Sequence, residues 1–187
     1  MTGVIDALKS DHINMLRLLE ILESQVEALE QGSDPDYEVV SGIMDYCLNY
    51  PDLYHHPKED VVFRALRKRR PEAVEKMGDL ENLHGELGAL TRRLAAAIHQ
   101  IVSGEELDRG AVVALGKEFI AAYRHHIEME EEYFFPVALN HLIAEDWADV
   151  KRDLRVADDP LFGSAPVADL RDLRHRVVAW HELSLSA

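Results

Sequence analysis

Six residues with metal-ligand chemistry occupy positions where helical periodicity calls for an apolar side chain. Four are histidines and two are glutamates: His12, His55, Glu59, His84, His126 and Glu130. A single buried histidine is usually a satisfied core residue, but a carboxylate on a core face must be paired, protonated or bound to a metal. Two such carboxylates together with four histidines therefore predict a buried cation site.

The spacing of these residues indicates a site for two ions. His55-x-x-x-Glu59 and His126-x-x-x-Glu130 each place an imidazole and a carboxylate on one helix face, one turn apart. Two carboxylates can bridge two cations while the histidines complete their coordination. Imidazole and carboxylate without thiolate suit iron, manganese or zinc, and helix-bundle cores are a common place for dinuclear carboxylate sites. The sequence leaves the choice among these metals open.

Helices must position these ligands, because the apolar residues recur at spacings of three and four. The pattern predicts long helices over about residues 5–29, 36–70, 77–101 and 108–137. We expect Asp34 to cap the second helix with Pro35 at its first position. We also expect a kink or a short break at Pro51 and Pro57. Four helices with short connections predict an all-α, up-down-up-down four-helix bundle.

The loop positions bring the histidines to one level. With loops centred near residues 34, 71 and 106, His12 lies about 22 residues before the first loop and His55 about 21 after it. His84 lies about 22 residues before the third loop, and His126 lies about 20 after it. At about 1.5 Å of rise per residue, the mismatches amount to a few ångströms. We therefore expect all four helices to contribute a histidine to a single layer.

The remaining residues predict a small helical extension. Residues 1–143 are expected to form the bundle and residues 144–187 a helical C-terminal extension that packs on the bundle or on a dimer partner. A short helix is expected around Trp147 and a last helix from Val167 to Glu182. We expect no second domain.

Composition excludes several classes of protein. The chain has 187 residues and a formal net charge of −15, which argues against nucleic acid or an anionic membrane as the main partner. One cysteine, Cys47, cannot form an internal disulfide. No apolar run approaches the roughly 20 residues that a membrane span needs, and Met1 to Leu8 lack the layout of a signal peptide. These features predict a soluble, cytoplasmic protein.

Two segments resemble the signature stretches of the hemerythrin-like (HHE cation-binding) family. They are His55-His56-Pro57-Lys58-Glu59-Asp60 and the run from His126 to Pro136, and Asp11-His12 and Asn82-Leu83-His84 resemble two further motifs of the family. The resemblance covers about residues 4–141. It implies a four-helix bundle with two irons bridged by oxygen or hydroxide, and it carries the ligand role to His12, His55, Glu59, His84, His126 and Glu130.

Some ligand positions stay open at this point. Oxygen-carrying members of the family have a second histidine one turn after the third-helix histidine, and Gly88 stands there in this chain. One iron would therefore lose a nitrogen ligand, or it would gain water or a nearby carboxylate, such as Glu81 or Glu128, and reversible oxygen carriage is put in doubt. His56 and His125 neighbour two of the proposed ligands, and Pro57 could exchange His55 for His56. The longer spacing from His126 makes Glu131 an alternative to Glu130.

Three functions compete. A binding or sensing protein would respond to oxygen, nitric oxide, peroxide or iron itself, acting through a partner or a homodimer. A di-iron enzyme would act on peroxide or nitric oxide and would need a proton donor, for which Tyr54 and Tyr123 are candidates. A structural or storage site would be coordinatively closed, whereas a reactive one keeps an open position. The missing ligand at Gly88 favours an open site, and we place sensing or metal handling ahead of catalysis.

Overall fold

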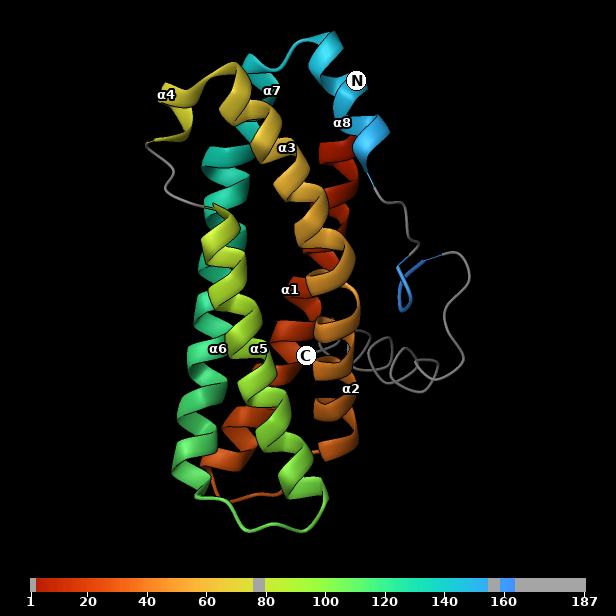
Figure 1. Cartoon of the computed structure of the whole chain (residues 1–187). Helices are drawn as coiled ribbons and strands as arrows, with labels where there is room; N and C mark the ends of the chain where they lie inside the picture. The colour runs from red at the N-terminus through yellow and green to blue at the C-terminus, as the bar shows by residue number, and fades with distance from the viewer. Residues whose placement is uncertain (1–2, 76–79, 155–158, 164–187) are drawn as a thin grey trace, which may run out of the picture.

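The computed structural model describes residues 3–75, 80–154 and 159–163, and it places no strand among them. The long helices lie side by side as rods (Figure 1). The first rod is α1 (Gly3–Glu30), and the third is α5 (Leu80–Val102). The second combines α2 (Tyr37–Asn49), η1 (Pro51–His55) and α3 (His56–Arg69), and the fourth combines α6 (Arg109–Met129), η2 (Glu130–Phe134) and α7 (Phe135–His141). The all-α prediction is confirmed.

The helix ends follow local chemistry. Asp36, and not Asp34, caps α2, because its side chain accepts a hydrogen bond from the Val39 backbone N–H at 3.2 Å; the expectation for Asp34 and Pro35 was therefore wrong. Asp108 caps α6 in the same way through the N–H of Ala111 at 2.7 Å. After α5 the chain turns at Gly104, whose φ of +87° is readily adopted by glycine alone.

The short break expected near Pro51 is present at Tyr50, where α2 ends and the backbone has φ −120° and ψ −64°. The rod then continues as the π-helical turn η1, where the N–H groups of Tyr54 and His55 both reach the carbonyl of Tyr50, at 2.9 and 3.3 Å. A π turn inserts an extra residue and changes which side chains face inward. Its consequence is that the successive residues His55 and His56 are both buried, at 0% and 3% exposure.

A second π turn, η2, begins at Glu130 and precedes α7. The sequence analysis did not predict it. Here too, successive side chains are buried together, since Phe134 and Phe135 are both almost fully enclosed. The two π turns lie in the two rods that carry the His-x-x-x-Glu pairs, so they belong to the local structure that aims those pairs inward.

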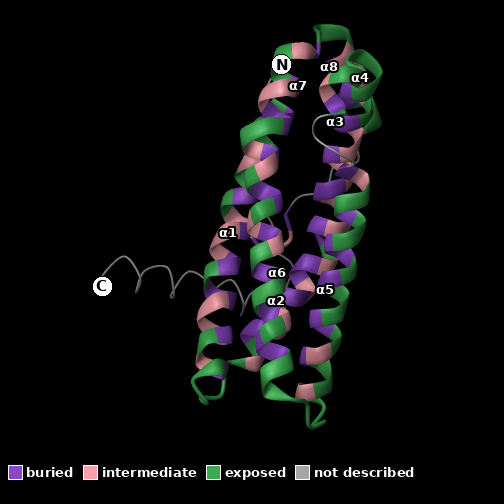
Figure 2. Cartoon of the chain, turned by 90° about the vertical axis from the view of Figure 1, so that its left-hand side faces the viewer, coloured by how far each residue is buried: buried purple, intermediate pink, exposed green. Residues whose placement is uncertain are grey.

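Two hydrophobic clusters fill the space between the rods, and buried residues line their inner faces (Figure 2). The larger cluster includes Leu22 and Ile43 with Phe119, and the smaller includes Leu8 and Phe135. α1 packs on α6, α2 on α5, and α5 on α6. In each rod, the one or two polar residues of this set lie between residues of the larger cluster and residues of the smaller cluster. An apolar layer therefore lies on either side of the polar one.

Two further helices lie at one end of the rods, α4 (Pro71–Val74) and α8 (Ala144–Asp153). α8 packs on α3, and Arg69 pairs with Asp146 through two hydrogen bonds of 2.8 and 2.9 Å. Beyond α8, Leu161 is fully buried in the larger cluster, and the Tyr46 hydroxyl donates to Asp159 at 3.0 Å. The helix expected from Val167 to Glu182 lies outside the described residues. Within the described part of the chain, no helix is long and apolar enough to cross a membrane.

Candidate metal centre

All six predicted residues meet in one buried layer. They come from each of the four rods: His12 from α1, His55 from η1, Glu59 from α3, His84 from α5, His126 from α6 and Glu130 from η2. None is more than 8% exposed, and both glutamates are fully buried. The common level expected from the loop arithmetic is thus the level at which the structure places them.

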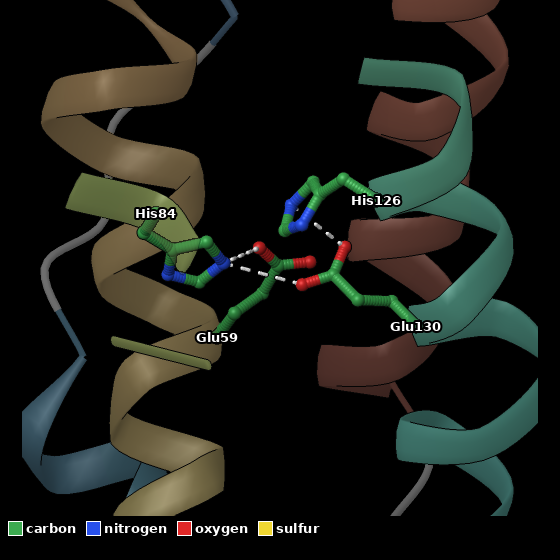
Figure 3. A group of neighbouring side chains, drawn as sticks. All are labelled: Glu59, His84, His126 and Glu130. Carbon is green, nitrogen blue, oxygen red and sulfur yellow. Dashed lines mark hydrogen bonds and ion pairs between the residues drawn. The ribbon is translucent and has the colours of Figure 1, made fainter. Parts of the chain in front are cut away.

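The layer divides into two groups of potential ligand atoms. Glu59, His84, His126 and Glu130 each offer one atom within 4.8 Å of the others (Figure 3). His12, His55 and Glu59 form a second such group. Glu59 belongs to both, since Oε1 lies 3.3 Å from His12 Nε2 and 3.1 Å from His55 Nε2, while Oε2 lies 3.5 Å from His84 Nε2.

Glu130 joins the groups from the other side. Its Oε2 lies 3.2 Å from His126 Nε2 and 3.4 Å from His12 Nε2, and its Oε1 lies 3.3 Å from His84 Nε2. Each carboxylate therefore faces histidines of both groups. Glu59 alone belongs to both groups of potential ligand atoms, and Glu130 belongs to the group with His84 and His126.

The orientation of these atoms fits cations better than mutual hydrogen bonds. Both oxygens of Glu59, Oε2 of Glu130 and the Nε2 atoms of His12, His55 and His126 are buried and have no partner in hydrogen-bond geometry. These atoms lie close to one another, but none of them is placed so that it can form a hydrogen bond with its neighbours. Unsatisfied buried polar atoms are costly, so a cluster of them calls for an ion. The residues present fit a pair of metal ions.

The outer nitrogens of three histidines are held by acidic side chains. Nδ1 of His84 lies 2.8 Å from Asp60, and Nδ1 of His55 lies 3.0 Å from Asp11. Nδ1 of His12 lies 3.1 Å from Glu131. Such carboxylates fix the tautomer that leaves Nε2 free as a metal ligand, and they raise its basicity. The sequence reasoning did not assign Asp11 or Asp60 this role; their position beside ligands in both motifs was the available signal.

The charges of the cluster favour a negatively charged pair of glutamates. Burial opposes ionisation of Glu59, but the positive charge of His55 and contact with His12 hold its pKa well below the ordinary value. Burial likewise opposes charging of His12, yet the carboxylates of Glu130 and Glu59 raise its pKa to about 10. The pKa of His84 is also raised to about 10, against its burial, by Asp60 and Glu130. In the absence of metal, protons on histidine neutralise the carboxylates, and metal ions would displace them.

The structure shows which of the alternative ligands left open by the sequence lie at the cluster. His125 is exposed and lies outside the cluster, whereas His56 is buried beside it. Glu131 is 36% exposed and contacts the outer nitrogen of His12, so Glu130 is the carboxylate inside the layer. Glu81 pairs with Arg64 and Arg67, and Glu128 is exposed. Neither of these last two carboxylates belongs to the groups of potential ligand atoms, so loss of the ligand or its replacement by water are the alternatives that remain at Gly88.

The remaining predicted histidines lie apart from the cluster or outside the description. His99 is 57% exposed on its side chain and pairs with Asp45, and His141 is half-buried near the end of α7. His175 and His181 fall outside the described residues. Of the two candidate proton donors, Tyr54 is half-buried, and Tyr123 is buried with its ring centroid 6.3 Å from that of His126.

A cavity of about 450 Å³ between α5 and α6 reaches the cluster. His126 lines it together with Leu87, Leu90 and Ala122, so a candidate ligand forms part of its wall. Charged side chains also line it, those of Glu86, Arg93 and Glu118.

The fold and the site define a class: an all-helical protein with a buried histidine and glutamate cluster suited to cations. The family model of the hemerythrin HHE cation binding domain matches residues 3–138, and the chain belongs to that family. Neither the curated proteins nor the solved structures yielded a match.

Proposed function

We propose that the protein is a dinuclear non-haem iron protein that binds and senses a small molecule such as oxygen, nitric oxide or peroxide. The observation that carries this proposal is the pair of ligand groups sharing Glu59, with inward-facing buried atoms left without hydrogen-bond partners. One ion would be held by His84 and His126 and the other by His12 and His55. Glu59 and Glu130 would bridge them. Manganese and zinc share the same ligand preferences and are the alternative metals.

The four rods are proposed to form the up-down-up-down bundle typical of this family, over residues 1–143, with residues 144–187 as an extension. Bound iron would supply redox chemistry and affinity for small ligands. The chain itself holds the histidines through Asp11 and Asp60, and it keeps water out with apolar clusters on either side of the layer. The cavity beside His126, of about 450 Å³, is large enough for a small molecule and supports binding of one next to this ligand.

A sensor of this kind would act through a partner or a homodimer, and nucleic acid and membranes are not proposed as partners of this acidic chain. We further propose a cytoplasmic location, because a chain with one cysteine forms no internal disulfide and so needs no oxidising compartment. Catalysis on peroxide or nitric oxide is the alternative role, and a structural or storage site is the third.

The test is anaerobic loading with Fe(II), followed by elemental analysis and by absorption spectra with oxygen, peroxide and nitric oxide. We expect two irons per chain and a stable spectral change with one of the three molecules. Rapid multiple turnover would favour the enzyme, and no response would favour storage or structure. His84→Ala and Glu59→Ala should each sharply lower the bound iron, while His99→Ala, at an exposed histidine, should not. Full occupancy in both site variants would refute the assignment.

A further inference from the structure

His56 is a buried histidine that the six-residue site does not use. Its ring centroid lies 4.6 Å from that of His84, nearly parallel to it, and 5.4 Å from that of His126, nearly perpendicular. His84 and His126 are the two imidazoles of one ligand group. His56 thus lies nearest to His84 of that group, and its ring centroid is also 5.6 Å from that of His55, in the other group.

The two nitrogens of His56 repeat the pattern of the candidate ligands. Nδ1 lies 3.4 Å from Asp52 Oδ1, as Nδ1 of His84, His55 and His12 each lies beside an acidic side chain. Nε2 is buried and has no hydrogen-bond partner. A buried polar atom without a partner is costly, and the cost is removed if the atom binds a cation.

Gly88 lies beside Asp52, on α5 one turn after His84. A Cβ built at Gly88 would come 3.3 Å from Arg92 Nη1 and 3.4 Å from Asp52 Oδ2. Asp52 belongs to η1, the π turn that directly precedes His56. The carboxylate beside His56 therefore packs against α5 one turn from His84.

We infer that His56 is a third nitrogen ligand of the ion held by His84 and His126, oriented by Asp52. This inference rests on the proposed dinuclear site. Glu59, His84, His126 and Glu130 would give that ion four protein ligands, and His56 would supply a fifth. His56 is outside the group whose atoms lie within 4.8 Å of one another, so binding through Nε2 would require its ring to approach the ion.

Cobalt(II) is a suitable probe, because its paramagnetism shifts the exchangeable ring N–H proton of each coordinated histidine far outside the ordinary proton NMR range. A histidine bound through Nε2 carries that proton on Nδ1. We expect five such signals from the wild-type protein loaded with two cobalt ions. Four signals would overturn the inference, while failure to bind two ions would instead overturn the proposed function.

His56→Asn identifies the fifth signal, since its side-chain amide can still donate to Asp52 but cannot replace Nε2. We expect one shifted signal to vanish and affinity for one of the two cobalt ions to fall by more than about 100-fold, beyond the 10–100-fold cost of an outer-shell change. His125→Asn, at the exposed histidine beside His126, should leave all five signals and both affinities unchanged.

Asp52→Asn is a second variant, which tests the inference even if His56→Asn does not fold. It should keep two ions and five signals, with one signal shifted and the affinity for one ion about 10–100-fold lower. Loss of two signals in His56→Asn, or an unchanged affinity for both ions with all five signals present, would show that His56 is not this ligand. The far-UV circular dichroism of each metal-free variant reports whether it is folded.

Discussion

Glu59→Gln tests the central claim that one buried carboxylate serves two cation sites. The substitution keeps the size and shape of the side chain and removes its charge. Three Nε2 atoms, those of His12, His55 and His84, lie 3.1–3.5 Å from its oxygens. We expect the variant to lose both ions, because each ligand group loses its bridge.

The magnitude for the metal-free protein can be worked from His12. Its pKa of about 10 is three units above pH 7, and at about 1.36 kcal/mol per unit its proton contributes about 4 kcal/mol to folding there. Glu130 is the remaining carboxylate at His12 Nε2, 3.4 Å away, so about half of this survives in the variant. His55 Nε2 also loses its contact with Glu59. The total loss should be about 3–5 kcal/mol, as for other broken buried ion pairs.

Urea unfolding of the metal-free protein at pH 7, with elemental analysis of the iron-loaded protein, measures both effects. Glu131→Gln is the matched control, because Glu131 contacts the outer nitrogen of the same histidine at 3.1 Å but is 36% exposed. Its loss should cost about 1 kcal/mol or less and leave two ions bound. If Glu59→Gln kept both ions and the wild-type stability, or if Glu131→Gln behaved as we expect of Glu59→Gln, the shared-bridge reasoning would be refuted.

Three further predictions follow from the same geometry. Asp60→Asn should lower metal affinity about 10–100-fold without abolishing binding, because His84 keeps its coordinating Nε2 but loses the carboxylate at Nδ1; an unchanged metal titration would contradict this. The thermal midpoint of the metal-free protein should fall as pH rises from 6.5 to 10, since the raised pKa values of His12 and His84 stabilise the fold fully below 6.5 and not above 10. The metal-loaded protein should change less over that range, and an equal fall in both forms would count against ion binding by these histidines. Gly116→Ala should lower the free energy of unfolding in urea by about 1 kcal/mol, because its Cβ would lie 2.7 Å from Val26 Cγ2 and overpacking outweighs the gain in helix propensity. Gly85→Ala is the control, since its Cβ would meet open space, and it should raise that free energy by about 0.5–1 kcal/mol. Similar results for the two variants would refute the close approach of α1 and α6.

The sequence determined the helical class and the level of the site. Apolar residues at spacings of three and four predict helices from local geometry alone, and the distances of His12, His55, His84 and His126 from their loops predict a common layer. A charged side chain on an apolar stripe, such as Glu59, is informative because burying it without a partner costs so much. These inferences need only the helical repeat and the chemistry of single residues.

Tertiary structure decided which neighbours face inward. The regular repeat of an α-helix separates His55 from His56 by about 100°, yet the π turn at Pro51–His55 buries both. The roles of Asp11 and Asp60 likewise depend on the histidines that face them, His55 and His84. These two contacts join residues from different rods, so no periodicity within one segment could have predicted them.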